Sequence, residues 1–365
     1  MLLAACALLV ASAAPMRAQM DSLYRWDLPS GWPAPSVPPD NPMTPAKVAL
    51  GRALFYDTRL SANGTQACAT CHEQAHAFAD TRPRALGSTG ERHPRGSMSL
   101  VNIAYASTLT WANGAMRRLE AQALVPMFGE EPIELGLRQA EASTFLGRLR
   151  AAPDYRRRFA EAFGGSPDPF SIDNVTKALA SFERSIISAR SPYDRYSDGD
   201  ERAISAAAQR GEQLFFSPRL GCFRCHGGFT FSQPPEFAGR SEVERGEAPL
   251  FQNNGLHAYS GSLTSPGEHQ GVFEVTAAPL DLGKFKPPTL RNIAVTAPYM
   301  HDGSLPTLDA VIDHYARGGR EHPTKSTIVR GFTLTATERA DLIALLNALT
   351  DTALLSDPRF SDPGR

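Results

Sequence analysis

Two short motifs constrain this chain of 365 residues more than any other feature. Each has the form C-x-x-C-H: Cys68-Ala-Thr-Cys71-His72 and Cys222-Phe-Arg-Cys225-His226. Two thiols at this spacing can form thioether bonds to both vinyl groups of one porphyrin, and the adjacent histidine is then placed to bind the iron. Four of the five cysteines lie in these motifs. The sequence therefore predicts two covalently bound haem c groups, with His72 and His226 as iron ligands.

The main alternative is a structural zinc site, because two C-x-x-C pairs can supply four thiolates. Such a site does not require a histidine directly after each pair. Its two halves also usually lie closer than the 154 residues that separate Cys68 from Cys222. The motif pair therefore favours haem over zinc.

The residues ahead of the two motifs match in register. Gly, Leu, Phe, Arg and Leu recur at an offset of 160 residues in two ten-residue strings. The strings are Gly51-Arg-Ala-Leu-Phe-Tyr-Asp-Thr-Arg-Leu60 and Gly211-Glu-Gln-Leu-Phe-Phe-Ser-Pro-Arg-Leu220. We interpret them as a duplicated haem-binding module with a longer loop before the motif in the first copy. Coincidence between two amphipathic helices is the alternative.

Composition indicates a compartment and excludes some partners. The net charge of −1 gives no reason to expect nucleic acid or an acidic membrane surface as a partner. Residues 1–18 are apolar and end in small residues, which predicts a signal peptide, although the usual positive n-region is lacking. A lipidated Cys6 is the alternative, but the apolar run follows this cysteine instead of preceding it. No other stretch reaches the ~20 apolar residues of a membrane span. The signal peptide and the covalent haem c together predict export to the periplasm of a bacterium.

The remaining pattern predicts a mainly α fold: two cytochrome c-like haem domains with long irregular loops. Capping signals and apolar periodicity predict helices over residues 44–56, 144–163, 173–188, 201–216, 307–317 and 335–349. A surface arm is expected over residues 28–45, and a long binding or lid loop over residues 227–286. A junction at 193–200 would separate an N-terminal haem domain, residues 19–195, from a C-terminal one, residues 196–352.

Several strings resemble the bacterial di-haem cytochrome c peroxidase and MauG superfamily. They are the two C-x-x-C-H motifs, residues 119–136, Pro288-Thr-Leu-Arg-Asn292 and Ala297-Pro-Tyr-Met-His-Asp-Gly-Ser304. Residues 40–47 and 297–304 are most similar to the di-haem enzymes encoded beside methanobactin genes. The resemblance covers roughly residues 25–350. It implies that the N-terminal haem meets peroxide and that the C-terminal haem stores or relays electrons.

The resemblance also implies a second axial ligand for the C-terminal haem, fourteen residues after the histidine of His-Asp-Gly-Ser. Counting from His301, which we assign as cofactor-binding on this basis, leads to Tyr315. Cytochrome c peroxidases carry methionine there, whereas MauG-like enzymes carry tyrosine. Thioether sulfur raises the reduction potential, while an anionic phenolate favours high-valent iron. His314 is a competing ligand that would project about 100° away on a helix, and a plain core aromatic is the other interpretation of Tyr315.

The resemblance implies an open N-terminal haem. The loop of residues 78–90 has no histidine at the position, near Ser88, where cytochrome c peroxidases carry one that blocks the iron. His93 could take that place only if the loop rearranged. Peroxide cleavage needs a base that moves a proton from the near oxygen to the leaving one. The family motif places this glutamate at Glu134, with Gln122 and Pro126 lining the distal face.

Two further assignments come from the same resemblance. Glu130 or Glu131 would compete with Glu134, because the segment before it holds two extra residues. Trp111 matches the tryptophan that the family places between its haems, although Trp-Ala-Asn-Gly replaces the usual Trp-Asp-Gly; core packing is the alternative for this side chain.

A calcium ion is a further expectation from the resemblance. Family members bind it through carbonyl oxygens that match those of Thr296 and Pro298. Gly96 stands where the asparagine ligand should be, so Asn102 or water would have to supply that oxygen.

Three functions fit these residues. The first is an H₂O₂-dependent, MauG-like oxidase that forms a high-valent iron state shared by two haems and oxidises a side chain of a partner protein. The second is a cytochrome c peroxidase that reduces H₂O₂ to water with electrons from a small cytochrome or cupredoxin. The third is a di-haem electron carrier, which Glu134, Gln122 and the lack of a blocking histidine disfavour. Tyr315 favours the first.

Overall fold

The computed structural model describes residues 24–232, 235–240, 250–259 and 269–364. Within them the chain forms helices joined by long irregular segments, and its β structure is confined to isolated bridges. The prediction of a mainly α fold is confirmed. The α-helices are α2 (Pro45–Phe55), α3 (Leu119–Gln122), α4 (Leu124–Phe128), α5 (Ala142–Ala151), α6 (Pro153–Phe163), α7 (Ile172–Ser185), α8 (Pro192–Ser197), α9 (Ala206–Phe215), α10 (Phe273–Thr276), α11 (Leu308–Ala316) and α12 (Ala336–Ala348).

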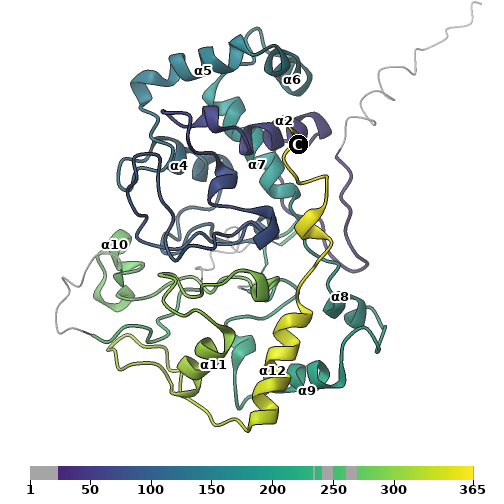
Figure 1. Ribbon diagram of the computed structural model, residues 1–365, viewed down its shortest axis with the longest axis vertical. Coiled ribbons are helices and arrows are strands. Elements are labelled where there is room, and N and C mark those ends of the chain that lie inside the picture. Colours follow the sequence, from purple (N-terminus) through teal and green to yellow (C-terminus); the bar gives the residue numbers. More distant parts are fainter. Residues whose placement is uncertain (1–23, 233–234, 241–249, 260–268, 365) are drawn as a thin grey trace, which may run out of the picture.

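The helices fall into two groups. Helices α2 and α4–α7 lie in the upper part of Figure 1, and α8, α9, α11 and α12 lie in the lower part. No described helix is both long and apolar enough to cross a membrane. The signal peptide predicted over residues 1–18 lies outside the described residues.

Most helix ends follow the capping signals in the sequence. Thr44 accepts a hydrogen bond from the backbone of Lys47 ahead of α2, and Thr307 accepts one from Ala310 ahead of α11. Thr335 and Glu338 form a reciprocal capping box on α12. These side chains satisfy amide donors that have no partner inside the helix.

Two predicted helices have different bounds in the structure. The segment 144–163 is broken into α5 and α6, because Ala152 adopts an extended conformation directly before Pro153. The α conformation is disfavoured before proline, since the proline ring clashes with the preceding residue. Helix α9 begins at Ala206, five residues later than expected, with Ser205 as its N-cap.

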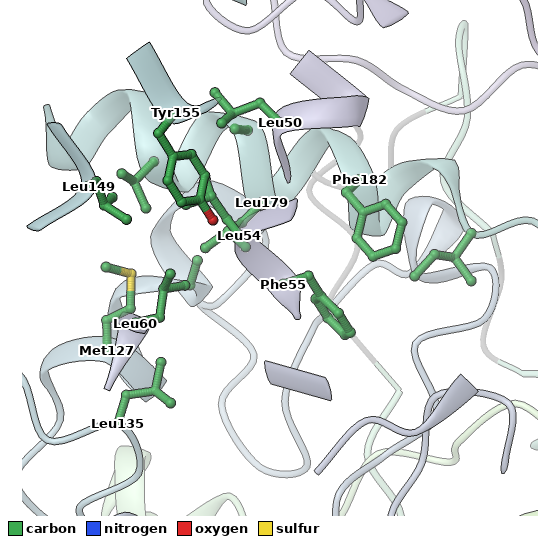
Figure 2. Close-up of a cluster of buried hydrophobic side chains, with 14 of the residues drawn as sticks. Leu50, Leu54, Phe55, Leu60, Met127, Leu135, Leu149, Tyr155, Leu179 and Phe182 are labelled. Atoms are coloured by element: carbon green, nitrogen blue, oxygen red, sulfur yellow. The ribbon is translucent and has the colours of Figure 1, made fainter. Parts of the chain in front are cut away.

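The first hydrophobic core forms where α2 crosses α7. Leu50, Leu54 and Phe55 of α2 pack with Leu179 and Phe182 of α7 (Figure 2). The close crossing depends on Gly51, because a Cβ atom there would lie 1.9 Å from the carbonyl oxygen of Ala178.

The second core repeats this arrangement with α9 and α12. Phe215 of α9 packs with Leu342 and Leu345 of α12 and with Leu349, which directly follows that helix. A Cβ atom at Gly211 would lie 2.0 Å from the carbonyl oxygen of Asp341 in α12. The two glycines aligned in the sequence therefore have the same function, which supports the duplicated module.

The two ends of the described chain are held against the first core. The C-terminal segment runs upward from α12 to α2 (Figure 1), where Leu354 and Phe360 join the first core. Residues 28–45 are irregular, as expected, but they are not a simple surface arm. Asn41 and Met43 are buried, and Trp32 lies 4.8 Å from the guanidinium of Arg291.

Candidate active site

The first haem attachment motif forms a compact turn that aims its histidine. Cys68–Thr70 is a 3₁₀ turn, and the backbone N–H of His72 donates to the carbonyl of Cys68 at 3.0 Å. The Nδ1 atom of His72 lies 2.9 Å from the carbonyl oxygen of Phe78. Burial lowers the pKa of His72, so the ring is neutral. A proton on Nδ1 leaves Nε2 free to bind iron.

The second motif has the same geometry. Cys222–Arg224 is a 3₁₀ turn, and the backbone N–H of His226 donates to Cys222 at 3.0 Å. The Nδ1 atom of His226 lies 3.0 Å from the carbonyl oxygen of Pro288. Burial lowers the pKa of His226 to about 4. Both histidines are thus oriented in the way that iron-binding imidazoles require.

The four cysteines fit haem and do not fit zinc. All four are free and partly buried. Within the described ranges, one group of three or more His, Cys, Asp or Glu side chains could hold a metal ion. It consists of His257, His269, His301 and Asp302 and contains no cysteine. The two cysteine pairs therefore do not form a Cys₄ site. Each pair with its histidine is suited to hold one haem c.

A cavity of about 430 Å³ borders the first motif. Cys68, Cys71 and His72 lie in its wall. The same wall contains the four residues assigned to catalysis by sequence: Trp111, Gln122, Pro126 and Glu134. The predicted iron-binding and catalytic side chains are therefore brought to one place.

Backbone hydrogen bonds fix the position of Glu134. The N–H of Leu135 donates to the carbonyl of Pro126 at 2.9 Å, and the N–H of Ser88 donates to the carbonyl of Glu134 at 2.7 Å. Burial lowers the pKa of His72, the Glu134 carboxylate acts in the opposite direction, and both residues line the same cavity. Glu130 and Glu131 are exposed and lie outside the cavity wall.

His93 lies beside Glu134. Its Nε2 atom is 3.4 Å from Oε1 of Glu134, and its ring lines the same cavity. The backbone N–H of Arg95 donates to Nδ1 of His93 at 3.2 Å. The loop of residues 78–90 brings no histidine into the cavity; His93 enters it from further along the chain.

Trp111 is anchored at the edge of this cavity. Its indole N–H donates to the carbonyl of Gly96 at 2.7 Å, and its carbonyl accepts from the backbone of Lys286 at 2.8 Å. The ring lies edge-on to His301, with 6.5 Å between centroids.

Tyr315 and His314 have different environments on α11. The Nε2 atom of His314 lies 3.0 Å from the carbonyl oxygen of Asn254, so its outer nitrogen is engaged. The side-chain amide of Asn254 donates to the hydroxyl of Tyr315 at 3.2 Å. Burial raises the pKa of Tyr315 to about 12, the Asn254 bond opposes this, and the charges of Cys225 and Cys222 add to it. Ile312, one turn earlier on α11, belongs to the hydrophobic core against which Cys222 and Phe223 pack, so this helix lies beside the second haem motif.

His301 lies in the convergent group and not in the wall of the first cavity. Its ring stacks on Phe285 at 3.7 Å, and burial lowers its pKa to about 3. Burial raises the pKa of Asp302, but hydrogen bonds from His257 and Ser304 outweigh it and hold this pKa below its usual range. The haem-binding role assigned to His301 gains no support from this position.

The side chains needed for calcium are missing. Thr296 and Pro298 line the cavity, but Gly96 offers no side chain. Both amide atoms of Asn102 are used by Ser188, since Nδ2 donates to its carbonyl and Oδ1 accepts its N–H, each at 2.9 Å. Gly96 and Asn102 therefore supply no free side-chain oxygen for the expected calcium site, which leaves water as the ligand there.

Two buried charged groups were not predicted. Glu183 on α7 lines the cavity, its Oε2 atom has no hydrogen-bond partner, and burial raises its pKa to about 8. Lys286 also lines it, donates to the carbonyl of Thr108, and has a pKa lowered to about 8 by burial. The sequence signal that could have indicated Glu183 was its position as a charged residue within the apolar stripe of residues 173–188.

Two covalent haem sites and a carboxylate-lined cavity beside one of them define a haem enzyme of the peroxidase class. A family model described as di-haem cytochrome c peroxidase matches residues 45–202, and one described as RoxA-like, cytochrome c-like matches residues 284–320. The methylamine utilization protein MauG of Methylorubrum extorquens is 36% identical over 89% of this chain and 83% of its own length. The chain belongs to the di-haem cytochrome c peroxidase family and is an oxidoreductase.

Other relatives are of both kinds within this family. The cytochrome-c peroxidase IdrP1 of Denitromonas iodatirespirans is 37% identical over 90% of this chain and 88% of its own. A crystal structure of a MauG-like protein associated with microbial copper homeostasis superposes with a TM-score of 0.89 at 44% identity, covering 94% of this chain and 100% of that one. Membership implies covalently bound haem c, peroxide as substrate and a redox partner.

Proposed function

We propose that this enzyme is a MauG-like oxidase, which uses H₂O₂ to oxidise a side chain of a partner protein. The observation that carries the proposal is Tyr315. It stands fourteen residues after His301, where the family resemblance puts the second axial ligand, and its hydroxyl accepts a hydrogen bond from the side-chain amide of Asn254. The competing His314 is held by a backbone carbonyl.

The identity of this ligand decides what the second haem can do. The two haems, when bound, would store the two oxidising equivalents of one peroxide molecule. A phenolate oxygen stabilises iron in higher oxidation states, whereas a thioether makes a haem a better acceptor of ordinary electrons. Tyrosine at position 315 therefore favours oxidation of a protein substrate over uptake of electrons from a small donor.

The chain's own residues provide the proton chemistry at the first haem site. Glu134 is positioned to take the proton from the near oxygen of peroxide and to return it to the leaving oxygen. Gln122 and Pro126 lie beside it in the wall of the cavity. Trp111, fixed by its bond to Gly96, lies on the wall of this cavity and would conduct charge between the two sites.

We assign the two functions to two parts of the chain. Residues 19–195 would form the peroxidatic haem domain and residues 196–352 the electron-transfer domain. Support comes from the two separate hydrophobic cores and from the paired glycines that shape them. We also propose a periplasmic location, because it follows from the signal-like residues 1–18 and from haem c.

Replacement of Tyr315 by methionine tests the proposal. We expect Tyr315→Met to raise the reduction potential of the second haem, because a neutral sulfur stabilises Fe(III) less than a phenolate does. Potentiometry and magnetic circular dichroism of the holoenzyme should report the change, and oxidation of the partner should stop. The matched control is His314→Gln on the same helix, which should leave the second haem's axial ligand signature intact. An unchanged potential in Tyr315→Met would refute the assignment.

The second candidate is a cytochrome c peroxidase with a small redox-protein donor. It is favoured by His93, because this histidine already lines the cavity beside Glu134 and a rearranged loop could bring it over the iron. In that case the diferric enzyme would not react with peroxide until one haem was reduced, and His93→Gln would remove the requirement.

A further inference from the structure

Three imidazoles and one carboxylate converge away from the haem attachment motifs. They belong to His257, His269, His301 and Asp302, and one ligand atom from each lies within 4.8 Å of all the others. The four residues come from two separate segments of the chain, so their proximity is a property of the fold. The mechanism proposed above uses none of them.

Two separations inside this group are close to those between metal ligands, and the four ligand atoms all lie within 4.8 Å of one another. Nδ1 of His269 lies 3.4 Å from Nε2 of His301, which is long for a hydrogen bond. Two ligands about 2.0–2.1 Å from a tetrahedral metal ion lie about 3.3 Å from each other. Nε2 of His257 lies 2.9 Å from Oδ2 of Asp302, so this pair would open by a few tenths of an ångström to admit an ion. The rings of His257 and His269 are stacked, with 3.7 Å between centroids and 23° between planes, so one of them has to turn for both to bind the same ion.

Neighbouring groups hold the ligands in place. The other oxygen of Asp302 accepts the backbone N–H of Ser304 at 3.0 Å, which fixes the carboxylate. The ring of His301 is stacked on Phe285, and its carbonyl accepts the N–H of Gly96 at 2.8 Å. Such outer contacts orient metal ligands and tune their affinity.

The group is closed on one side and open on the other. His301 and the Asp302 side chain are 5% and 6% exposed, whereas the His257 side chain is 35% exposed. An ion can therefore enter past His257 and be held against the buried pair.

We propose that this group binds a divalent transition-metal ion of the Zn²⁺ or Cu²⁺ type. Three imidazoles with one carboxylate suit such ions and not Ca²⁺ or Mg²⁺, which prefer oxygen ligands alone. The ion would join the segment that carries His257 and His269 to the His301-Asp302 turn beside Trp111.

Zinc binding to the holoenzyme tests this site, because thioether bonds to haem remove the four cysteines as competing ligands. The enzyme is stripped with a chelator, dialysed against Zn²⁺ and analysed for metals by mass spectrometry. We expect one zinc per two haem irons. Zinc-edge X-ray absorption should show a shell of N and O atoms at about 2.0–2.1 Å with imidazole scattering, and zinc should raise Tm.

Matched variants identify the ligands. His257→Gln and His269→Gln should weaken zinc binding more than ~100-fold while both haems stay bound and Tm without zinc stays close to wild type. His76→Gln changes a histidine outside the group and should bind zinc normally. The proposal is wrong if the wild-type holoenzyme retains no zinc, if either variant binds it as tightly as wild type, or if the absorption spectrum shows oxygen ligands only.

Discussion

At the scale of single residues, Glu134 is the group that we propose as the base in peroxide cleavage. Glu134→Gln keeps the size of the side chain but removes its ability to accept a proton. We expect the reaction of the holoenzyme with peroxide to slow by about 10²–10⁴-fold, while both haem spectra stay nearly native. Stopped-flow absorption under single-turnover conditions measures the rate.

The control for this variant is close by in the sequence. Glu131 is exposed and lies outside the cavity wall, so Glu131→Gln should react at the wild-type rate. If Glu131→Gln were slow and Glu134→Gln fast, the two extra residues in this segment would have shifted the base to position 131.

Glu183 gives a prediction about stability and pH. Burial raises its pKa to about 8 from an ordinary value of 4.5, with Arg184 opposing and Glu120 adding to the shift. The folded protein therefore keeps the Glu183 proton at pH values where the unfolded chain has released it. The contribution of this proton to the free energy of unfolding is complete below pH 4.5. It is lost as the pH rises through 8, by up to about 1.4 kcal/mol per pH unit.

Denaturation of holoenzyme at pH 5 to 9 measures this effect. Glu183→Gln should unfold with a flatter dependence on pH and should be more stable than wild type at pH 9. Glu161→Gln, on the exposed face of α6, should follow the wild-type curve. Parallel curves for wild type and Glu183→Gln would show that Glu183 is ionised in the folded enzyme.

At the scale of secondary-structure elements, the two modules share a second repeated feature besides the aligned glycines. Asn102 and Asn292 both have positive φ, of 58° and 61°, and each precedes a 3₁₀ turn. Met98 and Pro288 stand four residues before them, and their backbones hydrogen-bond to the imidazoles of His72 and His226. The strings Ser99-Leu-Val-Asn-Ile-Ala104 and Thr289-Leu-Arg-Asn-Ile-Ala294 carry this second repeat. Sequence alone could have revealed it.

The close helix crossings lead to a paired prediction. Gly51→Ala and Gly211→Ala each place a Cβ about 2 Å from a backbone oxygen of the facing helix, which cannot move without disturbing that helix. Each change should lower the free energy of unfolding by about 1–3 kcal/mol.

Gly147 in α5 is the matched control, because a Cβ there meets nothing within 4 Å. Gly147→Ala should stabilise the enzyme by about 0.5–1 kcal/mol, since alanine loses less backbone entropy than glycine in a helix. Chemical denaturation of the three variants compares them. Equal effects at all three positions would contradict the crossing geometry.

The sequence predicted helices where caps and apolar periodicity agreed, as at Thr44 and Thr335. It missed the break at Ala152, where the signal of Pro153 was present but was outweighed by continuous periodicity. The group around His257 could not be predicted, because residues 227–286 have no period and the proximity of His257 to Asp302 depends on the packing of irregular segments.

At the scale of the whole molecule, the chain holds two haem modules together with its own ends. Asn292 in the second module donates to the Ser188 hydroxyl at 2.8 Å, and Asn102 in the first pairs with the backbone of the same serine. The segment after α12 returns to the first core. The cavity beside the first motif is lined by Trp111 and by Pro288, whose carbonyl lies at Nδ1 of His226 in the second motif. A linear pattern indicates this arrangement only through family resemblance.

In the function proposed for this enzyme, both haem sites act on one peroxide molecule without prior reduction. The most direct measurement is freeze-quench Mössbauer spectroscopy of ⁵⁷Fe-labelled diferric enzyme mixed with one equivalent of H₂O₂ and no reductant. We expect both iron sites to become high-valent within the same quenched sample. A diferric enzyme that stays unchanged until one haem has been reduced would contradict it and would make this enzyme a cytochrome c peroxidase.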